Sequence, residues 1–135
     1  MKEIADTGLI VALLTRNDPF HVWALDAFRK HAPFHTCDAV LAEAACFFPN
    51  PVHVLKLVTR GDVVLDSTFV LAEQMPKIFG LAEKYADRPM DLADACVVRM
   101  TELNTRSRVW TVDRTDFSTY RRNGRERIVC EFPPA

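Results

Sequence analysis

Acidic side chains beside apolar stretches are the residues of this sequence best suited to chemistry. In PMDLADACVV, Asp91 and Asp94 lie three positions apart, which puts both carboxylates on one face of a helix. The residues after Asp94 are those of a protein core, where a carboxylate is costly unless it is paired, hydrogen-bonded or bound to a metal ion. Asp91 is also a good N-cap, with Asp94 as the acid of a capping box.

Further acids occupy comparable positions. Asp6 follows the apolar IA, Asp113 follows VWTV, and Glu43 lies within VLAEAA. Water-exposed loops rarely supply such apolar neighbours. Asp116 in DRTDF suits a turn or cap as well as it suits a ligand site, and Asp38 is better placed as a helix cap.

The elements that must position these acids alternate along the chain. Apolar periodicity, caps and breakers predict strands at 3–6, 34–37, 62–67, 107–113 and 127–132. They predict helices at 9–16, 19–31, 38–48, 52–60, 68–86 and 91–105. We expect Asp18 to cap the second helix and Pro76 to kink or break the fifth. Strands separated by helices pair in parallel with helices on both faces, which predicts an α/β fold.

Ligands of such a sheet bind beyond the carboxyl ends of its strands. Asp6, Glu43, Asp94 and Asp113 fall at or near these ends, so we expect them to converge. Converging carboxylates raise one another's pKa, and a divalent cation removes that penalty. Oxygen ligands without a Cys/His cluster select Mg²⁺ or Mn²⁺ over Zn²⁺. Such a site can generate a hydroxide-like nucleophile and stabilise charge on phosphorus.

Composition narrows the class of protein but suggests no particular partner. The 135 residues suit a single domain, and 49% hydrophobic with 26% charged residues is ordinary for a globular protein. The formal net charge is only −1. No apolar run reaches the roughly 18–20 residues that span a bilayer. The first residues lack the apolar region of a signal peptide, so we expect a cytoplasmic protein without a membrane contact.

The cysteines predict no zinc site and no disulfide. Cys37, Cys46, Cys96 and Cys130 are far apart and form no CxxC pair, whereas zinc ligands usually come in close pairs. Disulfides are rare in the reducing cytosol. Cys46 and Cys96 have small and apolar neighbours, which predicts that both belong to the core.

Arginines gather after the acids of the last motif. Residues 106–127 contain Arg106, Arg108, Arg114, Arg121, Arg122, Arg125 and Arg127. They could contact RNA phosphates, or they could form a solvated surface or the rim of a dimer. No aromatic motif of the RNA-recognition type is visible, so the sequence indicates no base readout.

At these motifs the sequence resembles the PIN-domain family, and within it the VapC-type toxins. IADTGLIVALLTRNDPFHVWALDAF resembles the first motif, with its Asp at the strand end. TCDAVLAEAACFF and MDLADACVVRM are similar to the second and third, with Glu43 and Asp94 as their acids. VWTVDRTDFSTYR is similar to the fourth, with Asp113 at the metal site and Asp116 as the frequent auxiliary acid. The match covers nearly the whole chain and keeps the order of the motifs.

The resemblance implies a single PIN-like domain over residues 1–135, a three-layer α/β/α fold with a short, mainly parallel central sheet. It implies a Mg²⁺- or Mn²⁺-dependent endoribonuclease in which Asp6, Glu43, Asp94 and Asp113 are catalytic and hold the metal. Asp91 and Asp116 would adjust the site or hold a second ion. It also implies RNA as substrate, pairing with a small antitoxin, and frequent homodimers.

Other functions remain open at this stage. The domain could keep its acids and act as a protein-interaction module without nuclease activity. A receiver-like phosphoacceptor also gathers acids at strand ends, but it needs a lysine at a late strand end. Here Arg114 follows the strand and no suitable lysine is nearby.

Overall fold

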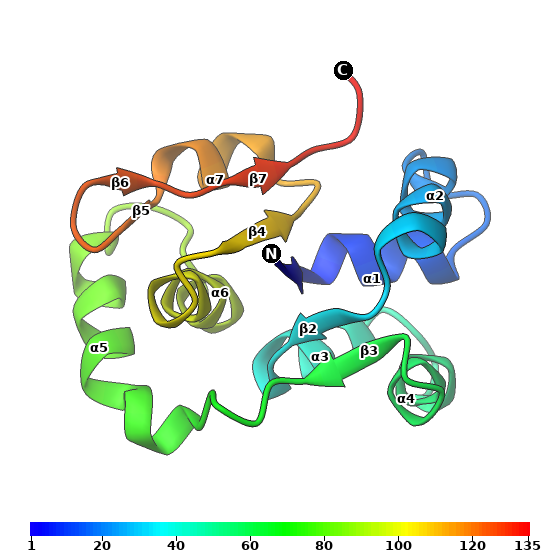
Figure 1. Ribbon diagram of the computed structural model, residues 1–135, viewed down its shortest axis with the longest axis horizontal. Helices are drawn as coiled ribbons and strands as arrows, with labels where there is room; N and C mark the ends of the chain where they lie inside the picture. Colours follow the sequence, from blue (N-terminus) through cyan, green and yellow to red (C-terminus); the bar gives the residue numbers. More distant parts are fainter.

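A computed structural model describes residues 1–135, and its centre is a five-stranded sheet in which every neighbouring pair is parallel. The strand order is β3–β2–β1–β4–β7 (Figure 1). The strands of this sheet are β1 (Lys2–Ala5), β2 (Phe34–Thr36), β3 (Val63–Leu65), β4 (Ser107–Trp110) and β7 (Cys130–Glu131). The predicted α/β fold with a short parallel central sheet is confirmed.

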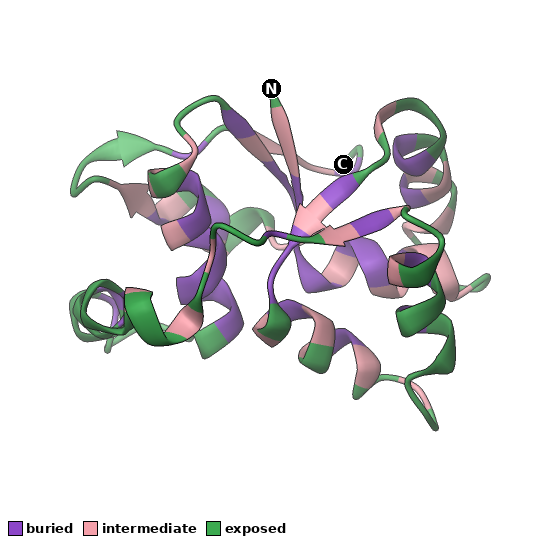
Figure 2. Cartoon of the chain, turned by 60° about the horizontal axis from the view of Figure 1, so that its bottom comes forward, coloured by how far each residue is buried: buried purple, intermediate pink, exposed green.

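Seven helices flank the sheet. They are α1 (Thr7–Leu14), α2 (His21–His31), α3 (Asp38–Ala45), α4 (Val52–Thr59), α5 (Leu71–Lys84), α6 (Leu92–Leu103) and α7 (Arg114–Thr119). Figure 2 shows the buried residues on the strands and on the helix sides that face inward, with exposed residues on the outer sides. No helix combines the length and the apolar character that crossing a membrane would require.

The centre of the sheet forms the core, although the strands also contain polar and charged residues such as Lys2 and Glu3 of β1. Ile4, Phe34 and Val109, from three adjacent strands, are fully buried. Because helices cover both faces of a parallel sheet, consecutive residues of one strand can both be buried, as Ile4 and Ala5 are in β1. The backbone leaves the core as soon as each strand ends, and the residue that follows β1 is Asp6.

The order of the strands creates one position suited to a ligand. From β1 the chain adds β2 and β3 on one side, and it then crosses over to place β4 and β7 on the other side. Adjacent strands whose connections diverge in this way leave a crevice beyond their carboxyl ends. Here the two strands are β1 and β4, which end immediately before Asp6 and three residues before Asp113.

Several predicted boundaries differ from the structure. The helix α5 continues through Pro76, so the proline does not break it, although at this point inside the helix it lacks the N–H that would bond to Ala72. Asp18 does not cap α2, which begins at His21; its carboxylate instead accepts a hydrogen bond from the backbone N–H of Phe20 at 2.8 Å. Cys46 is exposed rather than part of the core, because it follows the last turn of α3.

The C-terminal quarter contains elements that periodicity did not predict. The short helix α7 follows β4, and a small antiparallel hairpin joins β5 (Arg121–Arg122) to β6 (Glu126–Arg127). Its turn uses Gly124 at φ 86°, a left-handed conformation that glycine adopts readily. The predicted last strand, 127–132, is reduced to β7.

Candidate active site

A cavity of about 360 Å³ opens at the crevice beyond β1 and β4. Seven carboxylates line it: Asp6, Asp18, Glu43, Asp91, Asp94, Asp113 and Asp116. All six acids selected from the sequence therefore border one cavity, although they come from four separate parts of the chain. Asp18 is the additional one. From the sequence we expected Asp18 to be only a helix cap, because no local pattern shows that the loop before α2 folds over the crevice.

Asp6 lies at the floor of this cavity, where a residue just after the neighbouring strand β4 holds its side chain. Its side chain is only 5% exposed, and Thr111, just after β4, donates its hydroxyl proton to Asp6 Oδ2 at 2.7 Å. The same hydroxyl oxygen accepts the backbone N–H of Asp113 at 3.0 Å. Burial raises the pKa of Asp6 to about 6, while the Thr111 hydrogen bond opposes the rise.

Asp94 enters the cavity from the first turn of α6. Asp91 is the N-cap of this helix, and its Oδ1 accepts the backbone N–H of Asp94 at 2.8 Å. The buried Tyr120 hydroxyl donates to Asp94 Oδ2 at 2.9 Å. Burial, followed by the charge of Asp6, raises the pKa of Asp94 to about 8. Asp91 is thus a cap that also borders the cavity.

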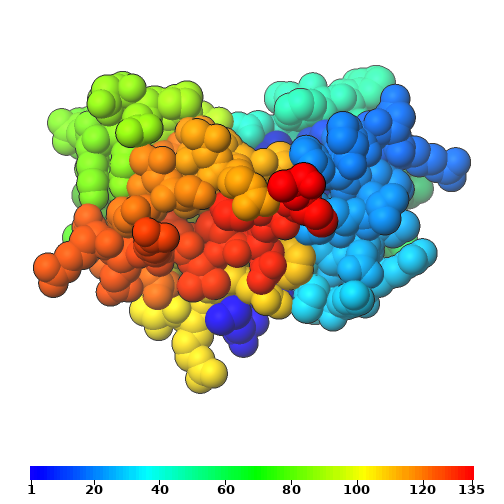
Figure 3. Space-filling model, turned by 90° about the horizontal axis from the view of Figure 1, so that it is seen from above, coloured from blue at the N-terminus to red at the C-terminus, as the bar shows by residue number.

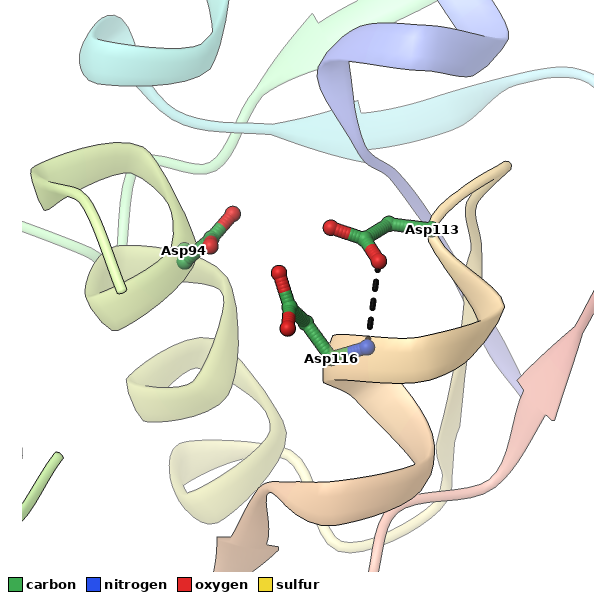
Figure 4. A group of neighbouring side chains, drawn as sticks. All are labelled: Asp94, Asp113 and Asp116. Atoms are coloured by element: carbon green, nitrogen blue, oxygen red, sulfur yellow. Dashed lines mark hydrogen bonds between the residues drawn. The ribbon is translucent and has the colours of Figure 1, made fainter. Parts of the chain in front are cut away.

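Asp113 and Asp116 repeat this arrangement at the start of α7. Asp113 caps the helix, and its Oδ1 accepts the backbone N–H of Asp116 at 3.1 Å. One carboxylate oxygen from each of Asp94, Asp113 and Asp116 can be chosen so that all lie within 4.8 Å of one another. Figure 4 shows these three carboxylates, from the starts of α6 and α7 and the residue that caps α7, pointing toward a common space.

Glu43 borders the cavity from α3. Burial raises the pKa of this carboxyl, and the neighbouring Asp91 carboxylate raises it further. The Thr7 hydroxyl is near enough to oppose that rise, yet it is buried and makes no hydrogen bond of ordinary geometry. Glu43 and Asp91 in turn raise the pKa of Asp6. The acids therefore form one electrostatically coupled group.

The acids that lie closest together in the structure are not the four that the sequence motifs assign to the metal site. The tightest group contains Asp116, which the sequence treated as auxiliary, together with Asp94 and Asp113. Asp6 and Glu43 line the same cavity but lie outside that group of three. Asp116 gains its place because α7 turns it back toward α6, and this short helix was not visible in the sequence pattern.

The donor set fits a divalent cation. Every charged group that lines the cavity is a carboxylate, and no cysteine or histidine lines it. Burial and mutual repulsion raise the pKa of Asp6, Glu43, Asp94 and Asp116. A cation bound among them would relieve that repulsion. The Thr7 hydroxyl leaves a buried polar atom that a ligand water could satisfy.

Most of the arginines in the C-terminal cluster are engaged within the protein. Arg108 pairs with Glu3 and with Glu131, while Arg114 donates to the backbone oxygen of Pro133 at 2.8 Å and lies over the Phe132 ring. Arg121 and Arg122 donate to backbone oxygens, and Arg122 also pairs with Glu126. The cluster stabilises the C-terminal segment, and only Arg106, Arg125 and Arg127 form no ion pair or side-chain hydrogen bond.

Comparisons with known proteins bear on the fold. No family model matches the chain, and no curated protein matches it in sequence. Among solved structures, it is similar to the crystal structure of Mycobacterium tuberculosis VapC20, described as a sarcin–ricin loop cleaving toxin. The TM-score is 0.69 at 16% identity, and the match covers 80% of this chain and 87% of that chain. At this identity the likeness concerns the fold alone, and the chain has the fold of the VapC-type PIN domains that its motifs resemble.

Proposed function

We propose that this protein is a Mg²⁺- or Mn²⁺-dependent endoribonuclease. The observation that carries the proposal is the convergence of the predicted acids on one cavity at the crevice between β1 and β4. The shared fold with VapC20, described as a sarcin–ricin loop cleaving toxin, supports RNA as the substrate class. A bound divalent cation would supply an activated water and a positive charge beside the reacting phosphate.

The roles we infer for the side chains follow from their contacts. Asp94, Asp113 and Asp116 would hold the cation, since their oxygens lie closest together. Asp6 and Glu43 would complete the site through water or hold a second ion. Thr111 and Tyr120 orient Asp6 and Asp94 through their hydroxyl protons. Asp91 would adjust the site electrostatically from its position as helix cap.

Partners and location are inferred from the resemblance. We infer a small antitoxin that covers the acidic cavity, a homodimer, and a cytoplasmic location. The toxin role would follow from such a partner, while the ribonuclease chemistry depends only on this chain's own cavity.

The test replaces one carboxylate without changing its shape. Asp94→Asn should abolish Mn²⁺-dependent cleavage of RNA while the fold is retained, because the amide cannot supply a charged ligand. Mn²⁺ should raise the melting temperature of the wild type and should not raise that of the variant. Asp26→Asn is the matched control, since Asp26 is an exposed residue of α2 that pairs with Lys30 outside the cavity.

Two results would contradict the proposal. Equal cleavage by wild type and Asp94→Asn would place the activity outside this cavity. A wild type that binds Mn²⁺ but cleaves no RNA would favour the protein-interaction module instead.

A further inference from the structure

One aromatic side chain stands exposed at the edge of the acidic cavity. Phe47 lines the cavity together with the carboxylates, yet its exposure is 65%. An exposed phenylalanine is not unusual by itself. Its position is unusual, because every charged group that lines the cavity is an acid, and a phenyl ring offers these acids neither a hydrogen bond nor a positive charge.

The backbone holds Phe47 outward in a defined way. After α3 ends at Ala45, the N–H groups of Phe47 and Phe48 bond to Ala44 and Ala45 at 3.2 and 3.1 Å. Phe48 packs against the core, so its neighbour must point elsewhere. The following Pro49 prevents the helix from continuing. The ring is therefore presented by a turn anchored on both sides.

A free cation lies beside the cavity. Arg88 is exposed in the loop between α5 and α6, directly before Pro89, which lines the cavity. It forms no ion pair, and its charge is close enough to lower the pKa of Asp116. Figure 3 shows the green segment that contains α5 and the blue-green segment between α3 and α4 on either side of a notch.

A flat apolar surface, an acidic floor and a nearby cation match the parts of one nucleotide strand. Aromatic rings stack on bases of any sequence because every base has a π-face. That face is available only when the base is unpaired. The arginine suits a neighbouring phosphate. A protein partner could also contact an exposed phenylalanine, but that contact would not depend on a flat aromatic ring.

We propose that Phe47 is the platform on which the base beside the scissile phosphate stacks. This inference rests on the proposed ribonuclease activity and adds a residue that positions its substrate. Phe47 is a positioning residue, because stacking holds the strand before and during the reaction alike. Such uniform binding alters KM and leaves kcat nearly unchanged.

The experiment measures Mn²⁺-dependent cleavage of a short unstructured RNA by full-length variants. Phe47→Leu keeps apolar bulk and removes the flat ring, and it should raise KM about tenfold with little change in kcat. Phe47→Trp should retain KM within about threefold of the wild type. Phe79→Leu is the matched control, because Phe79 is 62% exposed on α5 and does not line the cavity. The same RNA annealed to its complement should be cleaved more slowly than the single strand.

The possible outcomes distinguish a failure of this inference from a failure of the proposed ribonuclease activity. If the wild type cleaves, Asp94→Asn does not, and Phe47→Leu has the wild-type KM, stacking is wrong while the nuclease stands. Equal losses in Phe47→Leu and Phe79→Leu would indicate a general apolar association surface and would also overturn it. A wild type that cleaves no RNA would overturn both proposals.

Discussion

Hydroxyl groups determine how the buried carboxylates are presented. Thr111 and Tyr120 each donate one proton to an acid, at 2.7 and 2.9 Å. These bonds favour the charged form of Asp6 and Asp94 and so oppose the rise in pKa that burial causes. A carboxylate oriented and kept charged in this way is a better ligand for a metal ion.

Removal of one hydroxyl tests that function. Tyr120→Phe takes away the donor to Asp94, so the pKa of Asp94 should rise further and metal must displace a more tightly held proton. We expect Mn²⁺ affinity near neutral pH to fall about tenfold, measured by calorimetric titration. Tyr85→Phe is the control, because Tyr85 packs edge-on against Tyr120 but its hydroxyl accepts from Arg121 instead. Equal Mn²⁺ affinities in the wild type and Tyr120→Phe would show that the Tyr120 hydroxyl has no role in metal binding.

Most of the acids in the site lie at the starts of helices. Asp91 and Asp113 cap α6 and α7, and each binds the backbone N–H of the acid three residues further on. At the start of each of these helices, the capping acid and the proposed ligand three residues later therefore form one local structure. Caps with this spacing can be recognised in a sequence, whereas their approach to one another depends on how the helices pack. The start of α1 also packs closely against the segment after β4, because a Cβ on Gly8 would overlap the Val112 side chain.

A pair of glycine substitutions tests this approach between elements. Gly8→Ala should lower the free energy of unfolding by about 1–3 kcal/mol, because the added methyl group overlaps the Val112 side chain. Gly80→Ala, in α5 with nothing within 4 Å of the new Cβ, should raise it by about 0.5–1 kcal/mol. Urea denaturation measures both. A Gly8→Ala variant as stable as Gly80→Ala would show that the start of α1 can move away from β4 freely.

Across the whole molecule, the acidic cavity opposes folding when no cation is bound. The fold brings several carboxylates together and buries two of them, Asp6 and Asp94. Their pKa values in the folded protein, about 6 and about 8, lie above the ordinary value of 3.8. Hydrophobic burial elsewhere must offset this repulsion, and a core of 29 buried residues supplies it.

The stability of the metal-free protein should therefore depend on pH. Between roughly pH 4 and pH 8 the folded state binds more protons than the unfolded state, so the free energy of unfolding should fall as pH rises. In EDTA we expect a higher melting temperature near pH 5 than near pH 8. Excess Mn²⁺ should reduce this difference, and Asp94→Asn should reduce it without metal. A melting temperature in EDTA that increases over this interval would contradict the raised pKa values.

By itself, the sequence determined the alternation of strands and helices and the identity of six acids, because apolar periodicity and apolar flanks are local properties. Tertiary structure decided which of them are nearest neighbours. Asp116 joins Asp94 and Asp113 because α7 turns back toward α6. Asp18 reaches the cavity through a loop that folds over it, and the arginines turn inward to hold the C-terminal segment. Phe47 and Phe48 are the same residue type at adjacent positions, and only packing decides which one faces solvent. Contacts between distant segments depend on how the helices pack on the sheet, and no local pattern contains that information.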